Sequence, residues 1–355
     1  MKVGVIASAL RPMSRPLEAI FGRSGIEFDV DEGVPTFRSS AANFPPRMPR
    51  LARRRTVSMT LRLYEAYIAA YGKPDLIHVQ SALNAGCAAL QIKEQHGIPY
   101  IVHEHSTAFA RGLLSADELR CAQEVFDGAS QVFAVSSIFA ELLSQLIELP
   151  GSKLATIPNL VDKRFLRASF VPRETDQFRF LHVSGLEEKK NIQLALLAFA
   201  REFRGVPGIS IRIVGDGPKG PALKALAQQL GVDEQVEFVG ALSRDQIVDA
   251  FAETDAFVLP SSFETFGVVL IEAMAMGLPV VATRCGGPED IVSDASGFLV
   301  DKDDLEGFAS AMSALVATKK FNDRQALRDR CRLRYGAETI TAQWGAAYGQ
   351  ILNRA

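Results

Sequence analysis

Short apolar runs rich in β-branched residues alternate with segments of helical periodicity along the whole chain. The runs have the length of strands, and the segments between them place apolar residues three or four positions apart. In the first half the predicted strands are KVGVIAS, DLIHVQ (75–80), YIVHEH (100–105), QVFAVS (131–136) and LATIPN (154–159). In the second half they are FRFLHVS (178–184), SIRIVG (210–215), VEFVG (236–240), AFVLPS (256–261), VVAT (280–283) and GFLV (297–300). Strands that alternate with helices predict parallel sheets covered on both faces, which is the α/β class.

One stretch in the middle of the chain breaks this alternation. Residues 159–177, NLVDKRFLRASFVPRETDQ, are polar, contain a proline and lack clear periodicity, which predicts an interdomain linker. The 355 residues are also too many for one ordinary hydrophobic core. We therefore expect two doubly wound, Rossmann-like domains, over 1–165 and 166–336, and a C-terminal helix over 337–355 that packs back on the first domain. Ligands of such sheets bind beyond the carboxyl ends of the strands, so we expect the domains to face a central cleft.

An apolar segment of the second half, SSFETFGVVLIEAMAMGLPVVAT (261–283), contains two glutamates. Burying an unpaired carboxylate is costly, so their presence requires an explanation. The preceding strand predicts that Glu264 lies in a loop at its carboxyl end, and that a helix begins near Gly267 and ends at Gly277. A helix N-terminus favours phosphate, and a glycine there lets a diphosphate approach closely. Glu264 can then accept hydrogen bonds from sugar hydroxyls, whereas Glu272 either binds a hydroxyl or is an ordinary helix glutamate that pairs with a lysine or reaches solvent.

Three further strand–loop–helix junctions carry residues suited to ligand binding. VSGLEEKKN (183–191) places Lys190 where a strand gives way to a helix. This lysine either binds a phosphate as a point charge or is an exposed side chain beside two glutamates. IVGDGP (213–218) has Gly215 in a tight turn, and CGGPEDIV (285–292) is a second glycine-rich turn. Each of these two turns is a weak signal by itself.

Two histidines end a strand of the first half, His103 and His105 in VHEHS (102–106). We expect their side chains to point to opposite faces of the strand, so that only one of them reaches the cleft. A single histidine at such a place is either structural or part of a ligand site.

The composition argues against several classes of function. A net charge of −2 argues against nucleic acid binding by the whole chain, and no apolar run has the length needed to cross a bilayer. The N-terminus, MKVGVIASALRP, is typical of a first strand rather than of a signal peptide. The four cysteines have no metal-ligand spacing, so we expect small hydrophobic residues in a reducing cytoplasm and no metal site. They are Cys87, Cys121, Cys285 and Cys331.

Positive charge is concentrated between Gly33 and Tyr64, where seven arginines and no acidic residue occur. Arg53, Arg54 and Arg55 form the densest part of this stretch. It is either a solvated loop and helix face, or a surface for an anionic membrane or a phosphate-bearing acceptor.

Taken together, these motifs resemble the GT-B-fold retaining glycosyltransferases of family GT4. The E-x7-E motif of that family is present as Glu264 and Glu272. VSGLEEKKN stands in place of V-G-R-L-x-x-x-K-G, IVGDGP and VEFVGALSRDQ follow, and CGGPEDIV and GFLV come after the E-x7-E motif in the usual order. In the first half, PDLIHVQ, VHEHS, QVFAVS and ATIPNLVD resemble less specific landmarks of the same family.

The resemblance implies the GT-B architecture and the transfer of a hexosyl unit from a nucleotide-diphosphate sugar, usually a UDP- or GDP-sugar. The acceptor would be a saccharide or a lipid-linked glycan, as in envelope polysaccharide or lipopolysaccharide synthesis. Transfer would retain the anomeric configuration and need no cofactor and no obligatory metal. We expect the enzyme in the cytoplasm, with peripheral contact to the inner face of the cell membrane.

The resemblance also implies roles for single residues. His105, or His103 if the alignment shifts, would contact the donor sugar, Glu264 would hold the hydroxyls of that sugar, and Lys190 would bind phosphate. Glu272 would bind the nucleotide ribose. The donor side of the site would then consist of Gly185, Lys190, Gly215, Thr265, Phe266, Gly267, Val268 and Glu272.

The sequence departs from the family at two places. Gly185 stands where the family has an arginine, which removes one cation from the leaving diphosphate. ASALRPMSRP (7–16) replaces a common Gly-Gly loop and places Arg11 and Arg15 at the edge of the expected cleft. Arg11 therefore joins Arg53, Arg54 and Arg55 as a candidate contact for the acceptor or the membrane. A sugar-nucleotide 2-epimerase, a glycosyl phosphorylase or sucrose-synthase-like enzyme, and a catalytically degenerate sugar-nucleotide-binding subunit remain the alternatives.

Overall fold

The computed structural model describes residues 1–11, 25–44, 48–169, 177–318 and 323–353, so Arg15 lies outside the described residues. Contacts divide the chain into two compact units. Unit 1 consists of Met1–Ala134, Leu143–Ala155 and Ala347–Ala355, and unit 2 of Val135–Leu142 and Thr156–Ala346. The predicted boundary between residues 165 and 166 falls inside helix α7 (Lys163–Arg167). No helix of the described part is both long and apolar enough to span a membrane.

Unit 2 contains a six-stranded sheet in the order β10-β9-β8-β11-β12-β13. Every neighbouring pair in it is parallel. The six strands confirm the predicted ones and are β8 (Phe178–Val183), β9 (Ile209–Val214), β10 (Val236–Gly240), β11 (Ala256–Leu259), β12 (Val280–Thr283) and β13 (Gly297–Val300). The chain starts in the middle of the sheet, runs to one edge, returns to the middle and then runs to the other edge. This is the doubly wound order, and it confirms the α/β class for unit 2.

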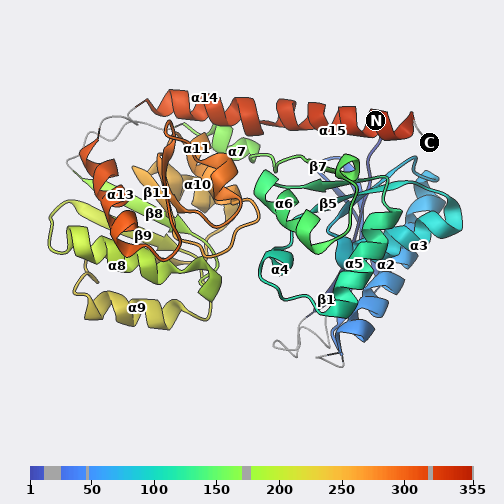
Figure 1. The fold of residues 1–355 in the computed structure, drawn as a ribbon, viewed down its shortest axis with the longest axis horizontal. Coiled ribbons are helices and arrows are strands. Elements are labelled where there is room, and N and C mark those ends of the chain that lie inside the picture. Colours follow the sequence, from blue (N-terminus) through green and yellow to red (C-terminus); the bar gives the residue numbers. More distant parts are fainter. Residues whose placement is uncertain (12–24, 45–47, 170–176, 319–322, 354–355) are drawn as a thin grey trace. The chain divides into compact units, whose positions relative to one another are not determined.

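Helices follow the strands of unit 2 and cover its sheet. They are α8 (Ile192–Phe203), α9 (Gly220–Gln229), α10 (Arg244–Ala252), α11 (Val268–Ala275), α12 (Pro288–Ile291), α13 (Leu305–Ala317) and α14 (Arg324–Tyr335). Helices α8 and α13 pack against one another, and α11 packs against α14 (Figure 1). Because helices shield the sheet, β11 and β12 are buried along their whole length. This burial explains why both strands read as continuous apolar runs rather than as alternating ones.

Unit 1 contains two smaller sheets. One has the order β4-β5-β6-β7, in which β4 pairs with β5 and β5 with β6 in parallel. Its strands are β4 (Ile77–Gln80), β5 (Tyr100–Glu104), β6 (Gln131–Ala134) and β7 (Leu154–Thr156). The helices of this unit include α2 (Pro49–Tyr71), α3 (Cys87–His96), α4 (Thr107–Ala110) and α5 (Ala116–Gly128), and the turn η1 (Ala82–Gly86) precedes α3.

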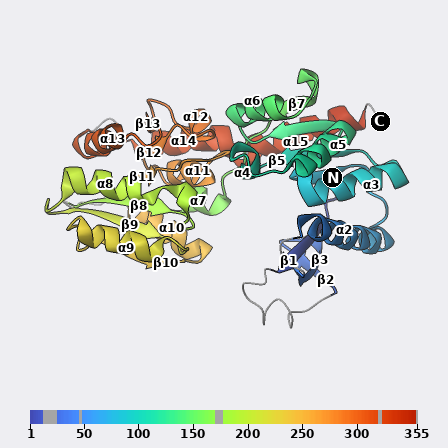
Figure 2. The same ribbon diagram turned by 60° about the horizontal axis from the view of Figure 1, so that its bottom comes forward.

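The second sheet of unit 1 contains a hairpin that the sequence pattern did not lead us to predict. Strands β1 (Val5–Arg11), β2 (Ile26–Asp31) and β3 (Val34–Ala42) form the order β1-β3-β2, with β2 antiparallel to β3. Figure 2 shows α2 beside this sheet, and α2 packs against β1 and β3. Glu32 and Gly33 have φ of 45° and 84°, which suits a two-residue hairpin turn. The alternation of Ile26, Phe28 and Val30 was the available signal.

The chain ends in the predicted C-terminal helix, α15 (Ala337–Leu352). Its residues up to Ala346 belong to unit 2, and those from Ala347 onward belong to unit 1. In unit 1 the Tyr348 hydroxyl lies 2.7 Å from Nδ1 of His78 on β4.

Candidate functional site

The strand order of unit 2 reverses between β8 and β11. In a doubly wound sheet, ligands bind at this point, outside the carboxyl ends of the two strands. The loop after β8 contains the short turn η3 (Glu188–Lys190), and the loop after β11 leads to Gly267 at the start of α11. The backbone N–H of Ser262 donates to the carbonyl of Lys189 at 2.8 Å, which fixes the two loops to each other. The sheet topology therefore brings two of the predicted site segments together.

Lys190 and Glu264 meet at this point. Nζ of Lys190 lies 2.6 Å from Oε1 of Glu264, and the Ser261 hydroxyl donates to the same oxygen at 2.9 Å. Their side chains are 18% and 10% exposed, so the pair is largely shielded from water. Each partner neutralises the charge of the other. A diphosphate can pair with the Lys190 ammonium group while sugar hydroxyls donate to the Glu264 carboxylate. Neither charge is then left unpaired.

The N-terminus of α11 lies directly after Glu264. Gly267 precedes the helix with φ of 99°, a left-handed conformation that disfavours any residue with a Cβ. The first N–H groups of a helix have no intrahelical partner, and they favour an anion. Thr265 and Phe266 are buried, whereas Val268 is 37% exposed. The predicted helix start at Gly267 is confirmed, and Gly277, with φ of 69°, follows the end of α11 at Ala275.

The turn CGGPEDIV (285–292) holds the loop that precedes α11 through backbone contacts. Gly286 and Glu264 form an isolated parallel bridge, and the N–H of Gly287 donates to the carbonyl of Glu264 at 2.8 Å. A Cβ on Gly287 would lie 2.1 Å from Cα of Phe266, so only glycine allows this approach. The hydroxyl of Ser136 donates to the carbonyl of Thr265 at 2.7 Å. This glycine-rich turn, a weak signal in the sequence, thus fixes the backbone of the loop that carries Glu264.

Glu272 lies inside α11 and is almost completely buried, at 1% exposure. Its Oε1 accepts a hydrogen bond from Nη2 of Arg244. Its Oε2 has no hydrogen-bond partner among the described residues. Burial raises the pKa of the Glu272 carboxyl above its ordinary value, and the Arg244 guanidinium opposes that rise. A buried carboxylate oxygen without a protein partner is the group that a ligand hydroxyl would satisfy.

Arg244 is a residue that sequence reasoning missed. It starts α10 after Ser243, whose side chain forms a capping box with Gln246. Nε of Arg244 lies 3.4 Å from Asp162, and its guanidinium lies 4.9 Å from the centre of the Phe165 ring. The motif VEFVGALSRDQ contains this arginine, but nothing in the local pattern links it to a glutamate 28 positions away.

Gly185 and Gly215, two of the three predicted site glycines, have different structural roles. Gly215 has φ of 132°, and a Cβ there would lie 1.8 Å from the carbonyl oxygen of Ser184, so the turn requires glycine. A Cβ on Gly185 would find no atom nearer than 3.7 Å, and Gly185 does not have a positive φ. The backbone at Gly185 therefore has room for a larger side chain.

The predicted site histidines belong to unit 1, and one expectation about them was wrong. The rings of His103 and His105 lie on the same side, with centroids 4.2 Å apart. Residues two apart in a strand share a face, so the expectation of opposite faces had no physical basis. Nε2 of His105 lies 2.6 Å from Oε1 of Gln80, and burial lowers the pKa of His105. The ring of His78 lies near that of His103, with centroids 5.9 Å apart, but no group of His, Cys, Asp or Glu side chains in the described parts of the chain could hold a metal ion.

Glu104 separates the two histidines and was also missed. It is completely buried, and its carboxylate accepts hydrogen bonds from the Ser81 hydroxyl and from the N–H groups of Ala82, His105 and Ser106, at 2.7 to 2.9 Å. Burial raises the pKa of Glu104, and these four hydrogen bonds oppose the rise. Glu104 thereby fixes the backbone from which His105 projects. A charged residue within an otherwise apolar strand was the available signal.

The arginine-rich stretch is divided between two environments. Nη2 of Arg53 lies 3.2 Å from Asp117 on α5, and its side chain is only 14% exposed. Arg54 and Arg55 are exposed, and Nη1 of Arg55 donates to the carbonyl of Ala42 at 2.9 Å. Nη1 of Arg11 donates to the Ser40 hydroxyl at 2.8 Å at the end of β1.

Comparisons with known proteins agree with this geometry. The family model for group 1 glycosyl transferases matches residues 163–333, and that for glycosyltransferase family 4 matches residues 20–165. N-acetyl-alpha-D-glucosaminyl L-malate synthase from Bacillus anthracis is 27% identical over 293 residues, 78% of this chain and 75% of that protein. The lipopolysaccharide core biosynthesis glycosyltransferase LpsE from Rhizobium meliloti is 36% identical over 171 residues, 46% of each chain. The chain thus spans three quarters of the first relative and about half of the second.

Solved structures show the same fold at low sequence identity. Sucrose-phosphate synthase from Thermosynechococcus elongatus superposes with a TM-score of 0.79 and 19% identity, over 99% of this chain and all of that one. HepE from Anabaena, in complex with UDP and glucose, superposes with a TM-score of 0.71 and 22% identity, over 89% of this chain and 86% of that one. Both family models, which together extend from residue 20 to residue 333, describe the same group of enzymes. The chain therefore belongs to the group 1 glycosyl transferases of glycosyltransferase family 4 and has their GT-B fold.

Proposed function

We propose that this protein transfers a hexosyl unit from a nucleotide-diphosphate sugar to a saccharide or lipid-linked acceptor, with retention of the anomeric configuration. We further propose that it works in the cytoplasm on envelope polysaccharide or lipopolysaccharide. LpsE is named for lipopolysaccharide core biosynthesis, which supports the proposed product. HepE binds UDP and glucose, which supports a nucleotide-diphosphate sugar as the donor. The family membership itself supports the glycosyltransferase activity.

One observation carries the proposal: the ion pair of Lys190 and Glu264 lies at the strand-order reversal of unit 2, next to the N-terminus of α11. In the reaction the bond between the anomeric carbon and the diphosphate oxygen breaks, and the diphosphate keeps the electron pair. Lys190 and the free N–H groups after Gly267 would stabilise the charge that develops on it. Glu264 would then accept hydrogen bonds from the sugar hydroxyls. The acceptor hydroxyl forms the new bond to the anomeric carbon, and its proton passes to the leaving diphosphate.

The pair of Arg244 and Glu272 would serve the nucleoside end of the donor. Arg244 occupies one oxygen of Glu272 and leaves Oε2 without a partner among the described residues. A ribose hydroxyl would donate the hydrogen bond that Oε2 lacks. Because this oxygen is buried, a side chain would have to move before the ribose could reach it. The assignment of His105 to the donor sugar stays a prediction.

We also propose that transfer needs no metal ion. Lys190 and the helix N-terminus would supply the positive charge that a divalent cation supplies in other transferases. Unchanged turnover after dialysis against EDTA is the expected result. Loss of turnover that Mg²⁺ or Mn²⁺ restores would contradict this part of the proposal.

Donor binding is tested by thermal denaturation of the full-length protein with UDP-, GDP- and ADP-glucose, and with glucose alone as a control. A donor at a hundred times its dissociation constant stabilises the folded state by about 2.7 kcal/mol. We expect one nucleotide sugar to raise Tm, the variant Lys190→Ala to lose most of that shift, and glucose alone to have no effect. If no nucleotide or nucleotide sugar raises Tm, the proposal fails.

The missing arginine at Gly185 favours one second candidate, a subunit that binds a nucleotide sugar without turning it over. Release of the nucleoside diphosphate on addition of a saccharide or lipid-linked acceptor separates the two. Binding with no release from any acceptor would support the second candidate over the transferase.

A further inference from the structure

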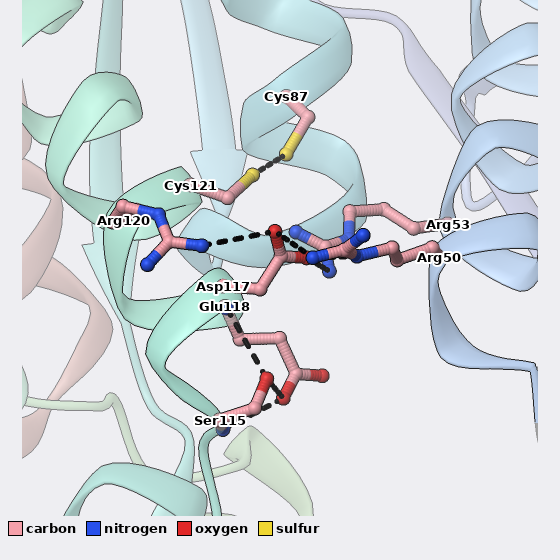
Figure 3. A network of polar contacts seen from close by, with 8 residues as sticks. All are labelled: Arg50, Arg53, Cys87, Ser115, Asp117, Glu118, Arg120 and Cys121. Atoms are coloured by element: carbon pink, nitrogen blue, oxygen red, sulfur yellow. Dashed lines mark hydrogen bonds and ion pairs between the residues drawn. The ribbon is translucent and has the colours of Figure 1, made fainter.

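Two cysteines lie next to each other in unit 1, whereas Lys190, Glu264 and Glu272 belong to unit 2. Sγ of Cys87 and Sγ of Cys121 are 2.7 Å apart, although 34 positions separate them in the sequence (Figure 3). Cys87 is the first residue of α3, and Cys121 lies in α5. Neither is fully buried. The expectation that all four cysteines are plain hydrophobic core residues does not describe this pair.

Positive charge surrounds one member of the pair. The Arg53 guanidinium acts electrostatically on the Cys121 thiol, and the carboxylate of Asp117, one turn before Cys121, holds that guanidinium in place. Figure 3 shows Arg50, Arg53 and Arg120 directed at Asp117. The hydrogen bond from Cys87, together with Arg53, lowers the pKa of Cys121, and the same hydrogen bond and burial raise the pKa of Cys87. Cys121 is therefore the thiol suited to nucleophilic attack, and Cys87 stays protonated until Cys121 has reacted.

A small molecule can reach both sulfurs. Cys87 and Cys121 line a hollow of about 620 Å³ between α2, α3 and α5. Arg53, Arg54, Arg62 and Glu65 of α2 line one side of it, and Glu94 and Glu124 lie on the other helices. This volume is within the range of ordinary small-molecule sites. The hollow thus presents charges of both signs, and its arginines can pair with the carboxylates of a reagent.

The other two cysteines provide an internal contrast. Cys285 and Cys331 belong to unit 2, and Cys331 donates to the carbonyl of Ile271 at 3.1 Å. Burial raises the pKa of each of these thiols to about 12. Neither has a second cysteine beside it among the described residues. They should therefore react slowly with the reagents that modify the pair.

We propose that Cys87 and Cys121 form a reversible dithiol–disulfide site that reacts with low-molecular-weight anionic disulfides such as oxidised glutathione. The Cys121 thiolate attacks one sulfur of the disulfide, which releases one glutathione thiolate and leaves glutathione bound to Cys121. Cys87 then loses its proton to solvent and attacks the Cys121 sulfur, which forms the Cys87–Cys121 bond and releases the second glutathione. Two protein thiols are oxidised and one disulfide is reduced, so atoms and electrons balance.

Closure of this bond would act on the segment that holds Glu104. The turn η1 ends at Gly86, directly before Cys87, and its first residue, Ala82, donates to Glu104. A Cβ on Gly86 would lie 2.6 Å from a methyl group of Val125 on α5, so α5 already packs tightly on this turn. A covalent link between α3 and α5 therefore restrains the backbone that positions His105. The chemistry of the thiol pair does not depend on the proposed transferase function.

The test uses the full-length protein in buffers with different ratios of reduced to oxidised glutathione. Free thiols are blocked at each ratio, and the cysteine peptides are identified by mass spectrometry. We expect a linked Cys87–Cys121 peptide that disappears on reduction, and no link to Cys285 or Cys331. The variant Cys87→Ser should stop at glutathione on Cys121, and Cys121→Ser should form neither product. Absence of the linked peptide at the most oxidising ratio would overturn the proposal.

A measurement on the wild-type protein keeps the proposal testable if a variant fails to fold. The rate of alkylation by iodoacetamide is followed for each cysteine against pH. Cys121 should react fastest, with a midpoint below the ordinary thiol pKa of about 8.5. Arg53→Ala should raise the midpoint of the Cys121 profile by about one pH unit, because it removes a cation that lowers the pKa of Cys121, and Arg53→Lys should restore much of the shift. Equal rates for all four cysteines would contradict the proposal.

Discussion

Nζ of Lys190 lies 2.6 Å from Oε1 of Glu264, although the two residues are 74 positions apart and follow different strands. The parallel pairing of β8 with β11 places their carboxyl ends side by side and so brings the loops together. Ser261 shares the same oxygen of Glu264. This ion pair is largely shielded from water and lies at the edge of the sheet where ligands of such folds bind. The groups of a charged substrate can replace each partner of the pair without leaving a charge unpaired.

Replacement of Glu264 by glutamine should lower transfer while it keeps the fold. Glutamine can still accept from Lys190 and Ser261, but the sugar hydroxyls lose a charged acceptor. Hydrogen bonds to charged groups contribute about 1.5–3 kcal/mol, which corresponds to a loss of roughly 10- to 100-fold in kcat/KM. Steady-state kinetics with the nucleotide sugar identified by the thermal denaturation panel measures this loss. Glu237→Gln, which removes a surface partner of Arg212, is the matched control and should have wild-type kinetics. Wild-type turnover in Glu264→Gln would contradict the role of Glu264.

Removal of Arg244 should destabilise the protein in a pH-dependent way. The folded-state pKa of Glu272 is raised by burial, so its contribution to stability is present below its unfolded pKa and lost as pH rises. Arg244→Ala removes the cation that opposes this rise and leaves the buried carboxylate unpaired. Arg244 is partly exposed, so we expect a loss of about 1–3 kcal/mol in unfolding free energy at pH 8, and a smaller loss at pH 5. Urea denaturation at both pH values measures it.

A double variant isolates the interaction between the two side chains. Glu272→Gln in the Arg244→Ala background removes the buried charge, so the extra loss at pH 8 should disappear. The cycle of single and double variants gives the coupling energy directly. If Arg244→Ala costs the same free energy at both pH values, the loss does not come from ionisation of Glu272.

Gly185 and Gly215, in the loops after β8 and β9, should respond in opposite ways to substitution. Gly185→Arg places a guanidinium where the backbone has room, so the fold should persist and the affinity for the nucleoside diphosphate should rise by up to tenfold. Gly215→Ala meets the Ser184 carbonyl at a positive φ, and we expect a loss of at least 1–3 kcal/mol in unfolding free energy. Thermal denaturation with and without UDP or GDP measures both. Equal destabilisation by the two substitutions would contradict the structural difference between these turns.

The exposed arginines Arg54 and Arg55 should carry any contact with an anionic membrane. Near such a surface each basic side chain contributes about 1 kcal/mol, so Arg54→Ala with Arg55→Ala should reduce binding to phosphatidylglycerol vesicles roughly 30-fold. Co-sedimentation measures the change, and neutral phosphatidylcholine vesicles are the control. Because Arg53 is engaged by Asp117, it is not part of this pair of substitutions. Binding that survives the loss of Arg54 and Arg55 would exclude this surface.

The sequence could predict the second half better than the first. Strands of a parallel sheet are buried on both faces and stand out as apolar runs, so β8 to β13 were all visible. The hairpin of β2 and β3 was not predicted, because Ile26, Phe28 and Val30 alternate with polar residues on an exposed strand. These side chains are about half exposed, so they do not form the apolar run that marks a buried strand.

By itself the sequence determined the α/β class, the strands of unit 2, and the places of Lys190, Glu264 and Glu272 beside strand ends or inside a helix. These features depend on local periodicity, on glycine and proline, and on motif order, all of which are readable along the chain. Only the tertiary structure decided the partners: Lys190 with Glu264, Arg244 with Glu272, and Cys87 with Cys121. Their separations of 74, 28 and 34 positions are closed by strand pairing and helix packing. Local sequence carries no record of which distant side chain will occupy the adjacent position, and the charge and pKa of each group depend on that neighbour.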